Sequence, residues 1–172
     1  MTRVERLGGP SDTARLEGRA AMLVLLAALA ALATALGLEH WGGYAPCSLC
    51  VLERWPWVGA SVAAGLGLLV GRARPALLAA ALLLAGNAVL SAYHVGVESG
   101  WFELPGTCAA GGSAATIEEL RAQLLAARPT CDRVALRVLG LSLAAWNGIA
   151  ALAVAAAAAA ALRLGRRDPL SS

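Results

Sequence analysis

The sequence predicts an all-α membrane protein, a bundle of four transmembrane helices joined by two outward loops, with a short amphipathic helix in the second loop. First, 59% of the 172 residues are hydrophobic and only 15% are charged, whereas a soluble domain has about 25% charged residues. Second, four stretches without any Asp, Glu, Lys or Arg are 17 to 25 residues long, which is the range of membrane-spanning helices. Third, most of the arginines lie before the first stretch, between the second and third, and after the fourth. In a bundle of four helices, these positions are all on the same side of the membrane. The length leaves no room for a separate soluble enzyme.

The four uncharged stretches give the expected elements in chain order. They are Ala20–Leu38, Trp55–Gly71, Pro75–Val97 and Val138–Leu162. We therefore expect helices at about 20–38, 51–71, 75–97 and 138–162, loops at about 39–50 and 98–137, and tails at 1–19 and 163–172. In the second loop, residues 117–125 form an amphipathic pattern that predicts a short helix on the membrane surface.

A soluble, alanine-rich bundle is the alternative, because Ala is an excellent helix former. A soluble helix needs a polar stripe. The few polar side chains in the four stretches are uncharged, and in the sequence they look isolated from one another. They are Thr34, Ser61, Asn87, Ser91, Ser142 and Asn147.

The arginines set the expected orientation. All fourteen basic residues are arginine; nine of them lie with four acidic residues beside one set of helix ends, and five lie with seven acidic residues on the other side. Because cytoplasmic loops carry the excess of basic residues, we expect both termini and the Arg72-Ala73-Arg74 turn to be cytoplasmic. The basic charge then reflects orientation, and nothing in it indicates nucleic-acid binding.

The first helix also matches part of a signal-peptide pattern, since Ala33-Thr34-Ala35 resembles a cleavage site. Its uncharged run is longer than a usual signal core, and its removal would leave an odd number of spans. We therefore expect it to be retained.

Most aromatic side chains are expected to anchor the bundle at the membrane interface, because all eight lie in or near its outward half. They are Trp41, Tyr44, Trp55, Trp57, Tyr93, Trp101, Phe102 and Trp146.

The four cysteines all fall on the outward side in this topology. Cys47 and Cys50 lie in the first loop, and Cys108 and Cys131 lie in the second. An even number of cysteines confined to the non-cytoplasmic face is typical of an oxidising compartment, where disulfides persist.

Cys47-Ser48-Leu49-Cys50 is a C-x-x-C at the expected start of the second helix. The spacing lets the two sulfurs meet within one turn, and a helix N-terminus can stabilise a thiolate. Val51 follows the motif, so it is not the C-x-x-C-H haem attachment signature. Zinc would usually need a second ligand pair, which Cys108 and Cys131 could supply only with a folded ribbon that this loop hardly provides, so we expect no metal.

Cys108 and Cys131 enclose 22 residues that are rich in Gly and Ala. Alone, the pair favours a loop-stabilising bridge, which contributes about 3 kcal/mol in the chain-entropy model. Beside an exposed C-x-x-C, an accessible disulfide that exchanges with the first pair becomes the better explanation.

Two further residues could serve this chemistry. Arg54 follows Cys50 by four positions, so on a helix it lies on the same face, where it could stabilise a Cys50 thiolate or donate to a ligand carbonyl. The alternative is an interfacial arginine that snorkels to water beside Glu53. His94, near the outward end of the third stretch, could face the same zone or be an ordinary interfacial histidine.

The segment from Pro46 to Arg54 resembles the DsbB family of bacterial disulfide-bond formation proteins. The similarity continues at Tyr93-His94, resumes at Cys131, and extends through Leu139-Gly140-Leu141-Ser142 and Trp146-Asn147. The order of the cysteine pairs and the four-helix plan are also similar.

The resemblance implies a quinone-dependent protein-dithiol oxidoreductase in the bacterial inner membrane, with both termini cytoplasmic and the cysteines periplasmic. A periplasmic thioredoxin-fold protein of the DsbA type would attack Cys108, the released Cys131 would attack Cys47, and Cys50 would become the thiolate beside ubiquinone or menaquinone. The resemblance also implies quinone contacts for Arg54, His94 and, more weakly, Glu53.

Three alternatives remain. A vitamin K epoxide reductase-like oxidase would carry its loop pair before its C-x-x-C, whereas here the C-x-x-C comes first. A paralogue dedicated to another dithiol partner would share every feature above. A non-enzymatic membrane protein with structural disulfides would keep both pairs oxidised in the presence of a reduced partner.

Overall fold

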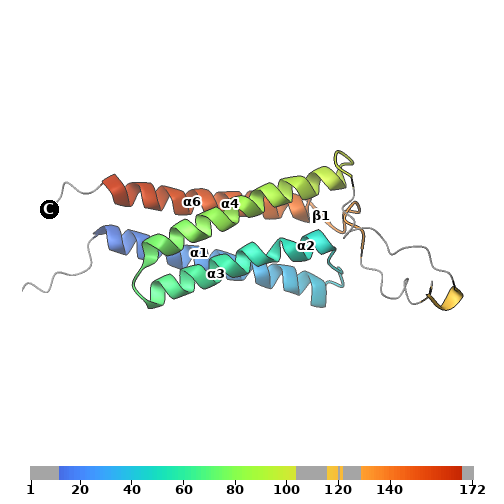
Figure 1. Ribbon diagram of the computed structural model, residues 1–172, viewed down its shortest axis with the longest axis horizontal. Coiled ribbons are helices and arrows are strands. Elements are labelled where there is room, and N and C mark those ends of the chain that lie inside the picture. The colour runs from blue at the N-terminus through green and yellow to red at the C-terminus, as the bar shows by residue number, and fades with distance from the viewer. Residues whose placement is uncertain (1–11, 104–115, 120, 122–128, 168–172) are drawn as a thin grey trace, which may run out of the picture.

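The computed structural model describes residues 12–103, 116–119, 121 and 129–167. Within them, four long helices pack side by side (Figure 1): α1 (Asp12–His40), α3 (Arg54–Leu69), α4 (Ala73–Glu98) and α6 (Leu143–Arg167). A short helix, α2 (Ser48–Leu52), precedes α3, and strands β1 (Arg137–Val138) and β2 (Leu141–Ser142) form an antiparallel pair before α6. The predicted class, an all-α membrane protein, is confirmed, apart from this short hairpin, whose strands have two residues each.

The helices alternate in direction, so the start of α1 and the end of α6 lie at the same end of the bundle (Figure 1). Arg74, at the beginning of α4, donates to Glu17 of α1 at 2.7 Å, which fixes the α3–α4 turn at that end too. The opposite end holds α2, the hairpin and the end of α4. All candidate site residues that the structure describes lie toward this second end.

Small side chains fill the centre of the bundle. Ala28, Ala60, Ala80 and Ala151 are completely buried, while large apolar side chains such as Val89 are exposed on the outside. Because lipid is as apolar as leucine, membrane helices associate through close backbone approach, which small residues permit. The burial pattern is therefore that of a bundle surrounded by lipid.

Three helices, α1, α4 and α6, are long and apolar enough to cross a membrane among the residues described. The predicted helix at 51–71 is divided: α3 has 16 residues, about 24 Å at 1.5 Å per residue, against a hydrocarbon core of about 30 Å. Pro56 explains the division, because it has no N–H for the Leu52 carbonyl and its ring crowds that carbonyl. The break falls at Glu53, which itself keeps helical dihedral angles.

The other predicted boundaries also shift. The helix expected at 138 begins at Leu143, because Leu139 and Gly140 turn the chain with positive φ and the Ser142 hydroxyl accepts from Ala145 N–H at 3.2 Å, capping the helix. At the other end of the bundle, α1 begins at Asp12 and α6 continues to Arg167, so both predicted tails are partly helical.

The short helix predicted at 117–125 is described only in part. Residues 117–119 and 121 are helical, and the Thr116 hydroxyl accepts from Glu119 N–H at 3.1 Å as an N-cap. The remainder lies outside the described residues, and its position on a membrane surface stays a prediction.

Candidate active site

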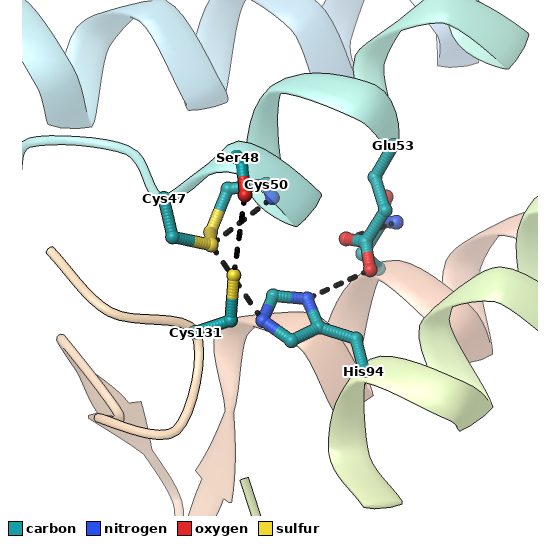
Figure 2. Close-up of a disulfide and its surroundings, with 7 residues drawn as sticks. Cys47, Ser48, Cys50, Glu53, His94 and Cys131 are labelled. Atoms are coloured by element: carbon teal, nitrogen blue, oxygen red, sulfur yellow. Dashed lines mark hydrogen bonds and ion pairs between the residues drawn. A yellow bond between two sulfur atoms is a disulfide. The ribbon is translucent and has the colours of Figure 1, made fainter. Parts of the chain in front are cut away.

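Cys47 and Cys50 form a disulfide at the first turn of α2, as Figure 2 shows. Cys47 is the N-cap residue, with extended backbone dihedral angles, and its sulfur accepts from the Cys50 N–H at 3.1 Å. Cys47 is buried and Cys50 is partly exposed. The C-x-x-C spacing thus brings the two sulfurs together through one turn of helix, as the sequence predicts.

Cys131, from the second loop, lies against this turn. Its sulfur is 3.4 Å from the Ser48 hydroxyl (Figure 2), and it packs in one buried cluster with Cys47, Leu49 and Val97. Cys131 is itself disulfide-bonded and 0% exposed, so its own sulfur is not exposed to solvent. Cys108 lies outside the described residues.

His94 joins the disulfide to Glu53. Its Nε2 is 3.6 Å from the Cys47 sulfur, and its Nδ1 is 2.9 Å from Glu53 Oε1 (Figure 2). The two side chains are only 2% and 5% exposed. The alternative of an ordinary interfacial histidine is therefore wrong, since His94 is buried against the sulfur of the C-x-x-C.

Glu53 is held by a buried polar network that the sequence analysis missed. Asn147 Nδ2 donates to Glu53 Oε2 at 3.0 Å and to the Ser91 hydroxyl at 2.8 Å, and Trp57 Nε1 donates to Asn147 Oδ1 at 2.7 Å. Asn87, with its side-chain amide oriented so that both polar atoms have partners, donates to the backbone carbonyl of Glu53 at 3.2 Å. It also accepts from Trp57 Nε1 at 3.0 Å. These polar side chains are therefore not isolated, and Trp57, only 3% exposed, is no interface anchor.

One sequence signal could have revealed part of this network. Asn87, Ser91 and His94 follow one another at intervals of four and three residues, which places them on one face of a helix. All three are buried on α4. A polar stripe ending in a histidine was therefore visible along one helix, whereas its meeting with Glu53 and Asn147 was not.

Arg54 has an ion-pair partner that the sequence analysis did not predict. Its guanidinium donates to Glu39 Oε2 at 2.6 Å, which ties the end of α1 to the start of α3, and both side chains are partly exposed. Glu53, expected as its neighbour, turns to His94 instead. Arg54 and Cys50 nevertheless line the same pocket.

The pocket has a volume of about 290 Å³ and lies between α1, the start of α3 and the start of α6. Its walls are mostly apolar, and its polar groups include those of Arg54, His94 and Asn147. Apolar lining from α1, the first loop, the second loop and α6 includes Leu32, Leu38, Pro46, Val134, Leu143 and Trp146. A pocket with apolar walls and a few placed polar groups is typical of a small-molecule site.

The arrangement suits disulfide exchange. The Cys47–Cys50 disulfide packs with a third cysteine, has a buried imidazole against the Cys47 sulfur, and belongs to the lining of a ligand-sized pocket. Thiol–disulfide exchange requires an attacking thiolate and access to a disulfide sulfur. Electrons could therefore enter from the loop and leave toward the pocket.

Comparisons with known proteins give a relative and a family for the chain. An uncharacterized protein of Rickettsia prowazekii (strain Madrid E) is 26% identical over 132 residues, which cover 73% of this chain and 76% of that protein. No solved structure matches the chain. The family described as "Disulfide bond formation protein DsbB" matches residues 17–161, a segment that includes all four cysteines, Arg54 and His94. The chain therefore belongs to the DsbB family.

Proposed function

We propose that this protein is an inner-membrane protein-disulfide oxidase that reoxidises a periplasmic thioredoxin-fold dithiol of the DsbA type and passes the electrons to ubiquinone or menaquinone. Membership of the DsbB family implies a disulfide-forming oxidoreductase of the membrane. The observation that carries the finer proposal is the place of the Cys47–Cys50 disulfide, packed with Cys131 on one side and open to the pocket on the other.

The first half of the reaction oxidises the partner. A partner thiolate attacks the sulfur of Cys108 in a Cys108–Cys131 disulfide, a mixed disulfide forms, and Cys131 leaves as a thiolate. The partner's second thiol then attacks the partner's first sulfur, which is bonded to Cys108 in the mixed disulfide. The partner leaves as a disulfide and Cys108 is released as a thiol. Burial of Cys131 favours Cys108 as the point of attack, because a protein partner needs access to the sulfur.

The second half transfers the two electrons to the C-x-x-C. Cys131 attacks Cys47, the Cys47–Cys131 bond forms, and Cys50 leaves as a thiolate beside the pocket. Cys108 then attacks Cys131, which restores the loop disulfide and releases Cys47. The proton that Cys108 loses in this attack goes to Cys47, and His94 Nε2, 3.6 Å from the Cys47 sulfur, is placed to accept that proton when the disulfide re-forms.

The pocket residues fit a quinone head group. An apolar ring with carbonyl oxygens at its edge needs apolar walls and a few donors, and the walls here are apolar with the Arg54 guanidinium, His94 and Asn147 among the lining groups. A bound quinone would supply the two-electron acceptor that returns Cys47 and Cys50 to the disulfide. Arg54, fixed by Glu39, would hold a carbonyl oxygen and favour the Cys50 thiolate.

The arginine distribution supports the orientation in this proposal. The ends of α1 and α6 rich in arginine lie together with the Arg72–Arg74 turn at one end of the bundle (Figure 1), and the described cysteines lie toward the other end. Basic ends are retained in the cytoplasm. With four spans, in which α2 and α3 together supply the second, both termini are cytoplasmic and the cysteines are periplasmic.

The test is quinone reduction by the purified protein in detergent, driven by a reduced DsbA-type protein, for wild type and for Cys50→Ala. We expect turnover in the wild type and none in the variant. A partner whose second, resolving cysteine is replaced by alanine should be trapped in a mixed disulfide with Cys108 in the wild type and in the variant. Wild-type turnover by Cys50→Ala would refute the relay.

A second variant separates the two disulfides. In the double variant Cys108→Ala/Cys131→Ala, the DsbA-type protein should no longer drive quinone reduction, while dithiothreitol, which is small enough to reach the C-x-x-C directly, should still do so. A wild-type protein that accepts electrons from dithiothreitol but not from the DsbA-type protein would indicate a paralogue dedicated to another partner.

A further inference from the structure

We propose that reduction of the Cys47–Cys50 disulfide creates a binding site for a thiophilic divalent cation, Zn²⁺, with Cys47 Sγ, Cys50 Sγ and His94 Nε2 as its ligands. The inference goes beyond the oxidase function. It requires neither the protein partner nor the quinone, so it can fail while the oxidase proposal stands.

The geometry of the three ligand atoms carries the proposal. They lie within 4.8 Å of one another, and Cys47 Sγ and His94 Nε2 are 3.6 Å apart. In a tetrahedral zinc site, with Zn–S of about 2.3 Å and Zn–N of about 2.0 Å, the sulfur and nitrogen ligands are about 3.5 Å apart. One edge of the tetrahedron is therefore already present, and C-x-x-C is a spacing at which two cysteines commonly bind zinc.

The surroundings of His94 fit a metal ligand. Its Nδ1 is 2.9 Å from Glu53 Oε1, and Asn147 holds the other oxygen of Glu53 at 3.0 Å. When His94 donates its Nδ1–H to the carboxylate, the lone pair of Nε2 faces the sulfur. Metal-binding histidines almost always have such a partner, which fixes the tautomer and raises the basicity of the ligand.

Charge and burial make the site dependent on redox state. Two thiolates neutralise one Zn²⁺, which limits the cost of placing the ion among side chains as buried as Cys47 and His94. Disulfide sulfurs cannot act in this way, because the thiolate is the ligand. A dithiol reductant gives two electrons and two protons to the disulfide and becomes a disulfide itself; Zn²⁺ then displaces the two thiol protons. The bound ion would oppose re-formation of the Cys47–Cys50 bond.

This site differs from the zinc site weighed on sequence alone. There the second cysteine pair supplied the remaining ligands, whereas here His94 supplies the third ligand and the fourth position is left to water or another donor, as in open zinc sites.

The test measures Zn²⁺ binding to the full-length protein in detergent, by competition with a chromophoric chelator under anaerobic conditions. One sample is oxidised and one is reduced with tris(2-carboxyethyl)phosphine. We expect one Zn²⁺ per chain in the reduced protein and none in the oxidised protein. The variant Cys108→Ser/Cys131→Ser, which leaves only the first pair, should give the same result when reduced. Co²⁺ in place of Zn²⁺ should produce sulfur-to-metal charge-transfer absorption only after reduction.

Histidine variants provide the matched comparison. His94→Ala should weaken Zn²⁺ binding at least tenfold, and Glu53→Gln should weaken it about tenfold to a hundredfold through loss of the carboxylate behind the ligand. His40→Ala should bind as wild type, because His40, the other histidine of the chain, is exposed at the end of α1 and contacts only its own helix through the Leu36 carbonyl at 3.0 Å among the contacts described.

Several results would overturn the proposal without relying on a folded variant. These are equal binding by the oxidised and reduced wild type, no binding by the reduced wild type, or binding that disappears in Cys108→Ser/Cys131→Ser. Wild-type affinity in His94→Ala would remove the histidine from the site and would also refute it.

Discussion

Replacement of Asn147 by alanine tests whether the buried network organises the site. The substitution removes three hydrogen bonds at once: those donated to Glu53 Oε2 and to the Ser91 hydroxyl, and the one accepted from Trp57 Nε1. It also leaves the carboxylate and the indole N–H buried with one partner fewer. Asn147→Ala should therefore destabilise the bundle and loosen the support of Glu53 behind His94.

The magnitude follows from the kinds of bond. Interhelical hydrogen bonds in membrane proteins average about 0.6 kcal/mol, so the bonds to Ser91 and Trp57 contribute roughly 1 kcal/mol together. The bond to the Glu53 carboxylate belongs to the charge-assisted class and contributes about 1.5 to 3 kcal/mol. We expect the free energy of unfolding to fall by about 2.5 to 4 kcal/mol.

The assay is reversible unfolding in mixed micelles with increasing dodecyl sulfate, followed by circular dichroism. Ser61→Ala is the matched control, because the Ser61 hydroxyl donates only to its own helix, to the Val58 carbonyl at 2.8 Å, among the contacts described, and its loss should change stability by less than about 0.5 kcal/mol. In a double-mutant cycle with Trp57→Phe, the coupling energy should be about 0.6 kcal/mol and no more than about 1.7 kcal/mol.

The reasoning is refuted if Asn147→Ala unfolds within about 0.5 kcal/mol of the wild type, since the network would then contribute no more than a surface contact. A coupling energy near zero with Trp57→Phe would separately refute the hydrogen bond from the indole to Asn147.

Three other predictions concern the pocket, the packing and the orientation. Arg54→Ala should raise the apparent KM for quinone about tenfold, the loss of one charge-assisted hydrogen bond. Arg74→Ala, which breaks an ion pair at the opposite end, should leave the KM unchanged. Equal KM values for all three proteins would leave Arg54 only its structural ion pair with Glu39. Gly67→Ala should destabilise the bundle by about 1 to 3 kcal/mol in the same micelle assay, because the added Cβ would clash with the Cβ of Ala76. Gly65→Ala is the control: its added Cβ would have nothing within 4 Å, so the variant should be neutral or slightly stabilised. In sealed vesicles of known orientation, an impermeant thiol reagent on the cytoplasmic side should label no cysteine after reduction, and labelling from that side would overturn the topology.

Sequence reasoning predicted the features that depend on local pattern. The apolar runs predicted the long helices, because the length of such a run against the bilayer thickness is a local property. The C-x-x-C predicted the pairing of Cys47 with Cys50, because one helical turn brings residues at that spacing together. Pro56 was also visible in the sequence. Its effect depends on whether the Leu52 carbonyl, four residues earlier, lies in the same helix, so the division of the second helix was missed.

The contacts between helices could not be predicted from one sequence. His94 could be proposed for the site, but not its contact with the Cys47 sulfur, because that contact depends on the rotation of α4 against α2. Arg54 could be placed one turn after Cys50, but its partner, Glu39, comes from the end of another helix.

By itself, therefore, the sequence determined that this chain is an all-α membrane protein of the DsbB family with a C-x-x-C whose two cysteines can pair, since composition, run length and short motifs carry that information. Only the tertiary structure decided which polar side chains meet. In the sequence, four polar or aromatic side chains look like isolated groups or interface anchors: Asn87, Ser91, Asn147 and Trp57. The packing of α3, α4 and α6 joins them into one network around Glu53. The physical reason is that a buried polar group must find a partner, but the partner is chosen by helix rotation and register, which small side chains in the core set through close packing.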